Sequence, residues 1–302
     1  MLEKKPLILV CCHKNTKIYQ NDIIKGILLN SALQTTNNFY PLKDNTGDNI
    51  SIKNNNYCEL TALYWAAKNI KETEYSHIGI FHYRRYLSFR SFNLFQKITP
   101  FNFLNEYLFA LQEKNIKNLL SKYDIILPKK IDLNRLHKNT TEKNTMRTNL
   151  YKEYNKELLD LSFSIMLDKF PKYKTALNKT MDYNKLYFKN IFIMKTNLFI
   201  EYSNFLFTIF FALEQKLKQK QYKHLTFPRI YGYLSERFLN IFLTYKQLEY
   251  QDKHQPLRIL ERDLIIKRTL ILNKESIQKI YKKLKTSFSN SYFKHLYQKI
   301  FQ

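Results

Sequence analysis

The stretch His77–Ser88, HIGIFHYRRYLS, limits the fold more than any other part of the chain. It begins with the apolar run Ile78–Phe81, whose length and polar boundaries predict a buried strand. The sequence then changes abruptly to an imidazole, two phenols and two guanidinium groups, at His82–Tyr86. In open α/β sheets, ligands bind at the carboxyl ends of the strands. The sequence therefore places a cationic, aromatic cluster where such a fold would bind a ligand.

The adjacent Arg84 and Arg85 indicate which ligand this cluster suits. Guanidinium groups bind planar, oxygen-rich anions through paired hydrogen bonds, so a phosphate or a diphosphate fits. The alternative is a solvated strand end whose arginines form surface ion pairs of little energetic consequence. For an isolated Arg–Arg dipeptide this alternative is favoured, and the choice depends on the neighbouring segments.

The charge of the chain raises a second class of partner. The formal net charge is +25, from 50 Lys and Arg residues against 25 Asp and Glu residues. Such an excess is typical of proteins that bind nucleic acid or an anionic membrane. The chain is also rich in Asn, Ile, Phe and Tyr, which share with Lys codons rich in A and T. Genome composition therefore accounts for part of the excess without any binding role.

Cysteine content and apolar runs indicate the compartment. Three cysteines in 302 residues make no disulfide framework, and no Cys/His cluster in the sequence suggests zinc. The run Pro6–Cys12 is too short for a signal peptide. Leu198–Leu213 contains polar residues and is predicted to be a buried helix, not a membrane span. We therefore expect a cytoplasmic protein.

Predicted strands and helices alternate along the chain. Strands are predicted at Pro6–Cys12, Ile78–Phe81, Tyr123–Pro128 and Lys189–Met194. Helices are predicted at Asp22–Leu33, Tyr57–Ile70, Asn102–Glu113, Glu157–Phe170 and Leu198–Lys218, the last capped by Thr196 or Asn197. This rhythm predicts an α/β fold with a parallel sheet. The polar segment Arg135–Tyr151 has few core-forming residues and is predicted to be a mobile loop or lid.

Three further segments have features of a ligand site or a structural terminus. The turn Asp44–Ser51 presents short Asp, Asn and Thr side chains that bond sugar hydroxyls or hold a cation, with an ordinary turn as the alternative. The carboxylate of Glu236 could act as a general base, or the neighbouring Arg237 could neutralise it structurally. Glu59 lies near a helix N-terminus, where the helix dipole favours a carboxylate on structural grounds alone.

The basic C-terminal part is expected to be separate from the rest. After Pro256 the alternating pattern degrades, and residues 257–302 contain a helix-like segment at Ile277–Ile300 with many lysines. Such a helix suits peripheral contact with an anionic membrane or with a partner, and a solvated terminal helix is the alternative. We expect an α/β domain at residues 1–256 and a basic helical extension at 257–302.

Six segments carry a resemblance to a known family: Asp44–Ser51, Tyr57–Asn69, His77–Ser88, Tyr123–Lys130, Asn190–Lys195 and Tyr231–Leu243. In this combination and order they resemble a bacterial family long labelled a domain of unknown function. The family occurs in gene clusters for capsule, lipopolysaccharide and other surface glycans, and some members are galactofuranosyltransferases. The segment Ile131–Tyr151 departs from the family's pattern, so the choice of sugar and acceptor is not carried over.

The resemblance implies a glycosyltransferase with a GT-A-like α/β fold, its mostly parallel central sheet flanked by helices. It implies a nucleotide-sugar donor, a UDP-sugar above others, and an acceptor that is a glycan or a lipid-linked glycan. Nucleic acid is not an expected partner. The expected location is the cytoplasm, or the inner face of the cell membrane if the basic C-terminal segment contacts it.

The resemblance also assigns roles to individual residues. The nucleotide base is expected at His13 and Lys14, and the diphosphate at Tyr83, Arg84, Arg85 and Arg237. Ribose or sugar hydroxyls are expected at Asp44, Asn45, Asp48 and Asn49. Glu236 is the expected general base, with Arg237 either orienting it or binding phosphate, and with His82 in reserve.

Metal independence is a further hypothesis. Related folds hold a divalent metal with an acidic pair, whereas here the basic cluster at His82–Arg85 occupies that place and can neutralise a leaving diphosphate directly. Binding of Mn or Mg remains the alternative, because Asp44 and Asp48 could still hold a cation.

Two other functions compete with a glycosyltransferase. A non-enzymatic basic protein that binds nucleic acid or an anionic membrane explains the charge, and it predicts one continuous basic face. A sulfotransferase or phosphotransferase would also handle phosphate groups, but the sequence has four glycines and no GxxxxGK[ST] pattern.

Overall fold

A nine-stranded sheet forms the centre of the fold in the computed structural model, which describes residues 4–34, 39–90, 109–136 and 144–266. Its strands are β1 (Lys5–Cys12), β2 (Ile24–Leu28), β3 (Leu42–Lys43), β4 (Tyr75–His82), β5 (Arg85–Leu87), β6 (Ile125–Pro128), β9 (Phe192–Lys195), β10 (Ile259–Arg262) and β11 (Leu264–Ile266). The order along the main path is β10-β6-β9-β4-β1-β2-β3. On this path β9 alone runs antiparallel to its neighbours, so the sheet is mostly parallel, as predicted.

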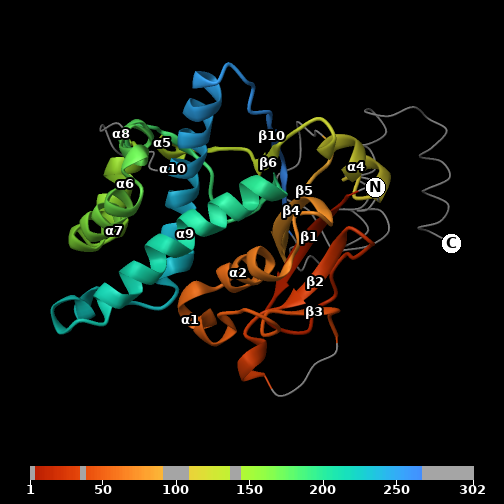
Figure 1. The fold of residues 1–302 in the computed structure, drawn as a ribbon, viewed down its shortest axis with the longest axis horizontal. Helices are drawn as coiled ribbons and strands as arrows, with labels where there is room; N and C mark the ends of the chain where they lie inside the picture. Colours follow the sequence, from red (N-terminus) through yellow and green to blue (C-terminus); the bar gives the residue numbers. More distant parts are fainter. Residues whose placement is uncertain (1–3, 35–38, 91–108, 137–143, 267–302) are drawn as a thin grey trace, which may run out of the picture. The chain divides into compact units, whose positions relative to one another are not determined.

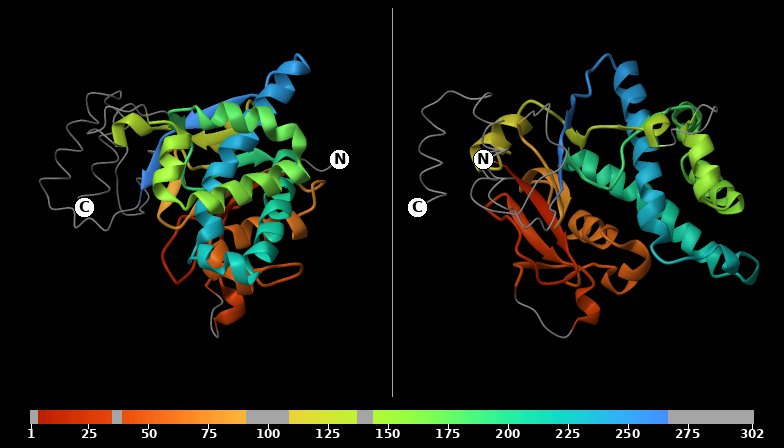
Figure 2. Two further views of the ribbon diagram at one scale, coloured as in Figure 1. Left: turned by 90° about the vertical axis from the view of Figure 1, so that its left-hand side faces the viewer. Right: turned by 180° about the vertical axis from the view of Figure 1, so that it is seen from behind.

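Helices cover this sheet and extend beyond it (Figure 1). They are α1 (Asn54–Tyr57), α2 (Leu60–Asn69), α4 (Glu113–Leu120), α5 (Leu133–Leu136), α6 (Met146–Glu153), α7 (Lys156–Lys169), α8 (Lys174–Met181), α9 (Thr196–Leu217) and α10 (Ile230–Asp252). Figure 2 shows α10 standing between the sheet and the group α6–α8. A small second sheet pairs β7 (Ile131–Asp132) with β8 (Lys185–Leu186).

Strand β1 explains why the sheet carries a core on each face. Its buried residues alternate between two apolar clusters, with Leu7 and Leu9 in the larger cluster and Ile8 and Val10 in the smaller. A strand buried on both faces must be apolar throughout, which is why KPLILVCC does not alternate in polarity. The larger cluster includes buried residues of α2, α9 and α10. This face therefore positions the helices that line the site described below.

Most predicted elements are confirmed by the structure. All four predicted strands are present, as β1, β4, β6 and β9, and helices occur at α7 and α9 close to the predicted bounds. Helix α9 is long and apolar enough to cross a membrane, but most of its apolar window is buried within the fold. The expectation of a buried helix at Leu198–Leu213 is therefore confirmed.

The helix predicted at Asp22–Leu33 is wrong. Residues Ile24–Leu28 form β2, which pairs in parallel with β1, and Ser31–Leu33 form a single 3-10 turn. The side-chain oxygen of Asn21 accepts hydrogen bonds from two backbone N–H groups ahead of it, as a helix cap would. The β-branched isoleucines that follow are buried in the sheet, and this burial overrides the local helix signal.

Smaller corrections concern helix ends. The helix predicted at Tyr57–Ile70 is split by Cys58, whose φ of 50° ends α1 before α2 begins. Helix α9 begins without a side-chain cap, because the hydroxyl of Thr196 instead donates to the carbonyl of Tyr75 at 2.7 Å. Most of the helix predicted at Asn102–Glu113 lies outside the described residues.

The segment Arg135–Tyr151 is only partly what the sequence suggested. Residues 137–143 lie outside the described part of the chain. Beyond them Thr145 forms a capping box with Thr148, and α6 begins. Met146 and Leu150 are fully buried, so this end of the segment belongs to the core and is not a loop.

The domain boundary expected at residue 256 also changes. Strand β10 pairs in parallel with β6, and β11 pairs antiparallel with β5. The first compact unit therefore extends through Lys267. The helix predicted at Ile277–Ile300 lies outside the described residues.

The turn Asp44–Ser51 is organised by the carboxylate of Asp44, which is fully buried. This carboxylate accepts five hydrogen bonds of 2.5–3.1 Å, from the backbone of Asn30 and Ser31 and from the hydroxyls of Ser31, Ser51 and Thr61. Within the same turn Gly47 has a φ of +57°, and a Cβ there would lie 1.9 Å from Oδ1 of Asn69. The composition of this turn thus serves the fold.

We expect Asp44→Asn to lower the free energy of unfolding by about 2 kcal/mol or more, because an amide leaves buried donors unpaired. Urea unfolding at pH 7 measures this change. Asp48→Asn, at an exposed position of the same turn, is the matched control and should change stability by about 0.5 kcal/mol or less. Equal effects of the two substitutions would contradict the structural role of Asp44.

Candidate active site

One pocket brings the basic strand end and helix α10 together. It lies at the carboxyl end of β4 and has a volume of about 140 Å³. Its lining residues are Glu59, Ile80, Phe81, His82, Arg84, Arg85, Lys189, Asn190, Ile191, Arg229, Gly232, Tyr233 and Glu236. Four of the residues expected at the site from the sequence are therefore neighbours in space: His82, Arg84, Arg85 and Glu236.

The tight connection between β4 and β5 fixes the basic side chains. His82 pairs with Arg85 across this connection, and the backbone N–H of Arg84 donates to Nδ1 of His82 at 3.2 Å. Tyr83 is buried beneath it, with the Arg84 guanidinium 5.0 Å from its ring centroid and the His13 ring edge-on at 4.9 Å. The Tyr83 ring therefore packs against the Arg84 side chain of the pocket, and His13 lies beside Tyr83.

The pocket is cationic overall. Four cationic side chains and two carboxylates line it, which leaves an excess of two positive charges. Burial and, secondarily, the charge of Arg85 lower the pKa of Lys189. A dianion such as a diphosphate would balance this excess.

His82 is unsuited to the reserve role of general base. Burial, followed by the charges of Arg85 and Arg84, lowers its pKa to about 3. Because Nδ1 accepts a hydrogen bond, the proton of the neutral ring lies on Nε2. At neutral pH His82 is therefore a hydrogen-bond donor toward the pocket and a very weak proton acceptor.

Glu236 has the properties that a general base requires. Its side chain is 22% exposed, and burial raises its pKa, while Arg237 and the backbone N–H of Lys189 act in the opposite direction. A carboxylate whose pKa is raised toward neutrality is a better proton acceptor than an exposed one.

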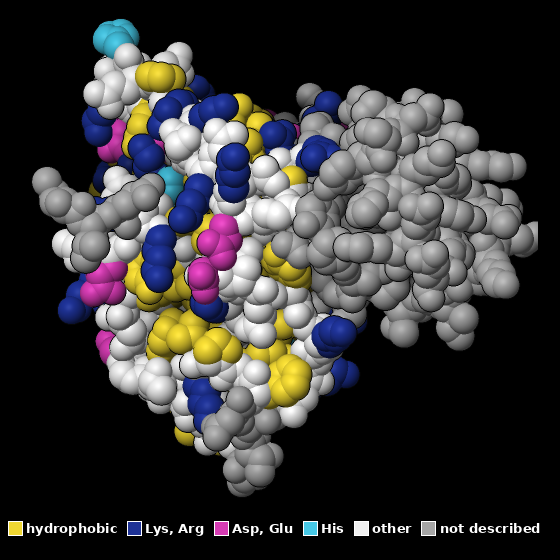
Figure 3. All heavy atoms as spheres, turned by 90° about the vertical axis from the view of Figure 1, so that its right-hand side faces the viewer, with side chains coloured by type: hydrophobic (Ala, Val, Ile, Leu, Met, Phe, Trp, Pro, Cys, Tyr) yellow, Lys and Arg dark blue, Asp and Glu magenta, His cyan; other side chains and the backbone are white. Residues whose placement is uncertain are grey.

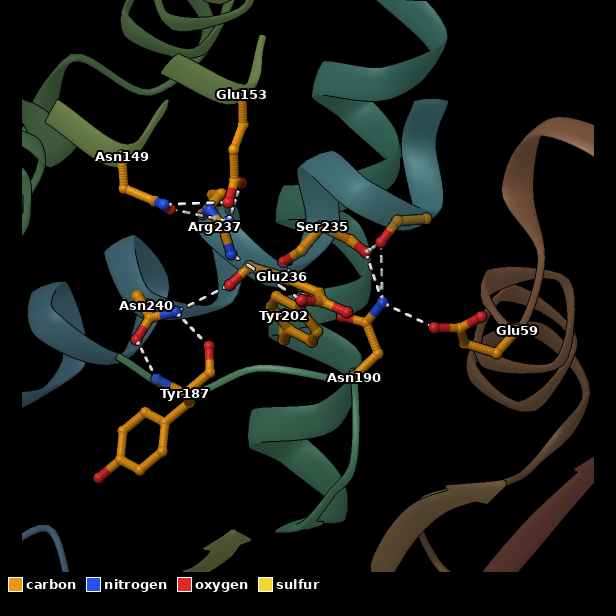
Figure 4. A network of polar contacts seen from close by, with 11 residues as sticks. Glu59, Asn149, Glu153, Tyr187, Asn190, Tyr202, Ser235, Glu236, Arg237 and Asn240 are labelled. Atoms are coloured by element: carbon orange, nitrogen blue, oxygen red, sulfur yellow. Dashed lines mark hydrogen bonds and ion pairs between the residues drawn. The ribbon is translucent and has the colours of Figure 1, made fainter. Parts of the chain in front are cut away.

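A hydrogen-bond network holds the start of α10 against the rest of the pocket (Figure 4). The side-chain amide of Asn190 donates to Oε1 of Glu59 at 2.8 Å, to the carbonyl of Gly232 at 3.0 Å and to the hydroxyl of Ser235 at 2.8 Å. Glu59 is therefore a pocket residue, and its position near a helix N-terminus did not reveal this.

Backbone strain is concentrated around the pocket. Among the described residues, seven other than glycine have a positive φ. Three of them line the pocket, Lys189, Asn190 and Arg229, and a fourth, Cys58, directly precedes Glu59. Such conformations are unfavourable, and they occur preferentially at functional sites.

Arg237 does not face the pocket. It is 4% exposed, and its Nη2 donates to Oε2 of Glu153 at 2.7 Å and to Oδ1 of Asn149 at 3.1 Å (Figure 4). Its Nη1 also lies 3.8 Å from Oε2 of Glu236, so the guanidinium contacts the carboxylates of both Glu153 and Glu236. The expectation that Arg237 binds the diphosphate is therefore corrected: Arg237 ties α10 to α6 and lies beside the carboxylate of Glu236.

The remaining predicted donor-binding residues lie apart from this pocket. Asp44 is fully buried and its carboxylate is occupied by the chain itself. Asn45 is exposed, Asp48 accepts from the Tyr64 hydroxyl, and Asn49 bonds within its own turn. Lys14 is exposed beside His13, and its backbone carbonyl accepts from Tyr40.

Some pocket residues were not expected from the sequence. Lys189, Asn190, Arg229 and Tyr233 come from loops and a helix start, where their residue types carry no distinctive pattern. Lys189 and Asn190 lie one residue before β9, and Arg229 directly precedes α10. A polar pair before a buried strand was the only available signal.

The described residues do not fit a protein-held metal. Among them, no group of three or more His, Cys, Asp or Glu side chains is placed to hold a metal ion. Glu59 and Glu236 stand among four cations, whereas divalent metals require several oxygen ligands. We derive no step through a metal.

The low pKa of His82 predicts a pH effect on stability. Below about pH 6.5 the unfolded chain binds a proton at this residue, whereas the folded chain stays neutral down to about pH 3. The folded state therefore loses stability as the pH falls through this window. Without the imidazole, His82→Gln should show a smaller loss between pH 7 and pH 5, by on the order of 1 kcal/mol in urea unfolding. Parallel losses in both proteins would contradict the assignment of His82 as a neutral, buried ring.

Comparison with known proteins shows which family the chain belongs to. A family profile described as a domain of unknown function, DUF4422, matches residues 7–247. No match was found among curated proteins. A solved structure, the WbbM bifunctional glycosyltransferase in its apo form, is 28% identical with a TM-score of 0.75. The match covers 88% of this chain and 46% of that one, so the chain spans less than half of the WbbM chain.

The likeness to WbbM confirms the α/β glycosyltransferase-like fold expected from the sequence. The family match covers most of the chain, including both motifs that meet in the pocket. The chain therefore belongs to the DUF4422 family.

Proposed function

We propose that this protein is a glycosyltransferase that moves a sugar from a nucleotide-sugar donor to a surface glycan. The observation that carries the proposal is one pocket in which a cationic strand end faces the half-buried carboxylate of Glu236. The likeness to a bifunctional glycosyltransferase supports this interpretation.

The cationic wall suits the leaving diphosphate. Arg84, Arg85 and Arg229 are positioned to stabilise the negative charge that grows on the diphosphate as its bond to the sugar breaks. The volume of about 140 Å³ is below the ~300 Å³ lower end for complete small-molecule sites. The pocket therefore suits the reacting sugar and diphosphate, with the nucleoside directed toward His13 and Lys14.

Glu236 completes the reaction on the acceptor side. Its carboxylate takes the proton from an acceptor hydroxyl while that oxygen forms a bond to the anomeric carbon of the donor. The bond from this carbon to the diphosphate oxygen breaks, and the electron pair leaves with the diphosphate. His82 assists as a neutral donor through its Nε2–H group.

The clustering of cations in one pocket favours an enzyme over a basic binding protein. A binding protein for nucleic acid or membrane would present a continuous basic face. On the face shown in Figure 3, Lys and Arg side chains run in a row across the upper part, with acidic and apolar side chains beside and below it. In the described part of the chain, four cations also gather in one pocket, as a transferase site requires.

Finer details of the proposal come from the family resemblance. We propose a UDP-sugar donor, with galactofuranose as a candidate sugar, and an acceptor in capsule or lipopolysaccharide synthesis. The cytoplasm or the inner face of the cell membrane is the proposed location.

Replacing Glu236 tests the chemistry. A panel of nucleotide sugars, UDP-linked ones first, is screened by donor hydrolysis and thermal shift to find the donor. With that donor, Glu236→Gln should reduce transfer by about 100-fold or more while donor binding stays within about twofold, since only the proton acceptor is lost.

The matched control is Glu214→Gln, a partly buried carboxylate outside the pocket that is paired with Lys53. It should retain near-native turnover. Near-normal turnover by Glu236→Gln would reject the assignment of the base, and a protein that neither binds nor hydrolyses any nucleotide sugar would reject the function.

We expect transfer to continue in excess EDTA, because guanidinium groups take the place of a metal at the diphosphate. Initial rates with and without EDTA should agree within about twofold. Loss of transfer that Mn or Mg restores would instead show that a cation is required.

A further inference from the structure

A second groove opens beside the pocket, and Tyr233 lines both. The groove has a volume of about 460 Å³, within the ~300–1,000 Å³ range of small-molecule sites. Tyr154, at the end of α6, and Phe227, just before α10, complete its aromatic lining. Neither residue lines the pocket described above, here called the donor pocket, and neither belongs to a motif identified in the sequence.

The three rings form a row with accessible faces. The ring centroid of Phe227 lies 6.4 Å from that of Tyr154 and 6.5 Å from that of Tyr233, with interplanar angles of 35° and 31°. Stacked rings in the core are much closer, as at Tyr173 and Tyr245, whose centroids are 4.1 Å apart. Tyr233 is 40% exposed. Tyr154 and Phe227 are partly exposed, so the parts of these rings that line the groove are open to a ligand.

Polar groups surround this row. Glu153, Asn155 and His224 line the groove, and His224 lies 3.1 Å from Glu157. Within the described residues, no hydrogen bond occupies the hydroxyl of Tyr154 or of Tyr233. An apolar floor with a polar rim matches a sugar ring, which has C–H groups on its face and hydroxyls on its edge.

The position of the groove relates it to the reaction. Tyr233 and Glu236 are three residues apart on α10, so their side chains are neighbours on the helix surface. The Arg229 guanidinium lies over the Tyr233 ring at 5.2 Å, on the side of the donor pocket. A ligand in the groove would therefore lie near Glu236.

The charge of the groove selects among acceptors. Its lining contains one carboxylate and one imidazole and no Lys or Arg. A separate surface groove, the basic groove, is lined by four cations and two carboxylates: Lys129, Lys130, Arg135, Lys185, Asp132 and Glu261. A phosphate-bearing acceptor would favour this basic groove. We propose that the aromatic groove binds a neutral sugar ring of the acceptor glycan and directs its hydroxyl toward Glu236. This proposal rests on the glycosyltransferase function proposed above.

Saturation-transfer NMR tests binding without any need for turnover. Methyl β-galactopyranoside and methyl β-glucopyranoside are the probes, each at millimolar concentration. The native protein should transfer saturation to the ring protons of at least one probe, Phe227→Ala should lose most of the signal, and Phe227→Tyr should keep it. A thermal unfolding curve confirms that each variant is folded. No signal from the native protein, or an unchanged signal from Phe227→Ala, overturns the proposal.

Kinetics separates this proposal from the function itself. With a glycoside that the native protein accepts, Phe227→Ala should raise the acceptor KM about tenfold or more, as expected for loss of an apolar contact. Donor hydrolysis should stay unchanged. The control Lys185→Ala, in the basic groove, should leave both values at the native level. If Lys185→Ala raises the acceptor KM and Phe227→Ala does not, the acceptor lies along the basic groove and the proposal is wrong. Failure of donor hydrolysis in the native protein would reject the function, while the NMR result still decides the groove.

Discussion

The side-chain amide of Asn190 makes the contacts on which the site depends. It joins Glu59 at the start of α2, Gly232 and Ser235 at the start of α10, and its own segment before β9. Asn190 is 1% exposed, and its buried NH2 group finds its hydrogen-bond partners in these three contacts, while its Oδ1 has none among the described residues. The amide therefore fixes the first turns of α10 relative to the sheet, and Glu236 follows directly after Ser235.

Close packing maintains the strained backbone around this amide. Each positive φ at Cys58, Asn190 or Arg229 costs about 1 kcal/mol or more, and only surrounding contacts can hold it. Gly232 allows α10 to approach Cys58, since a Cβ at this position would lie 3.3 Å from the sulfur. Nearby, the rings of Tyr57 and Tyr231 stack with centroids 4.2 Å apart. The aromatic content of the chain thus supports the geometry of a charged pocket.

Sequence patterns predicted the sheet better than the site. Buried strands such as β1 and β4 are visible because short, unbroken apolar runs are typical of strands that are covered on both faces. The prediction of a helix at Asp22–Leu33 failed because the conformation of this segment depends on its pairing with β1, which the local sequence does not encode. The sequence predicted the basic strand end at Arg84 and Arg85, and the structure places both in the pocket.

The polar turn illustrates what residue type alone cannot decide. Asp44 and Glu236 are both acidic residues in polar surroundings, yet five hydrogen bonds from the chain occupy Asp44, whereas Glu236 faces a cavity. For Glu59 the sequence led to the opposite mistake. Its place at a helix N-terminus was a sufficient structural explanation for the carboxylate, whereas the structure places it in the pocket, bonded to the distant Asn190. Only tertiary contacts distinguish a carboxylate that holds the fold from one that faces a ligand.

The first two turns of α10 bring the different parts of the site together. Arg229 directly precedes the helix, and Gly232, Tyr233 and Glu236 lie in its first two turns, so all four are close together in space. Gly232 and Glu236 are four residues apart, so they lie on the same face of α10, toward the donor pocket. Tyr233 is the residue after Gly232, and its side chain lines both the donor pocket and the aromatic groove. A cation for the leaving group, a carboxylate for the proton and a ring for the acceptor are thus carried by one rigid element. Their relative positions depend on helix geometry, and their distance from the basic strand end depends on the contacts of Asn190.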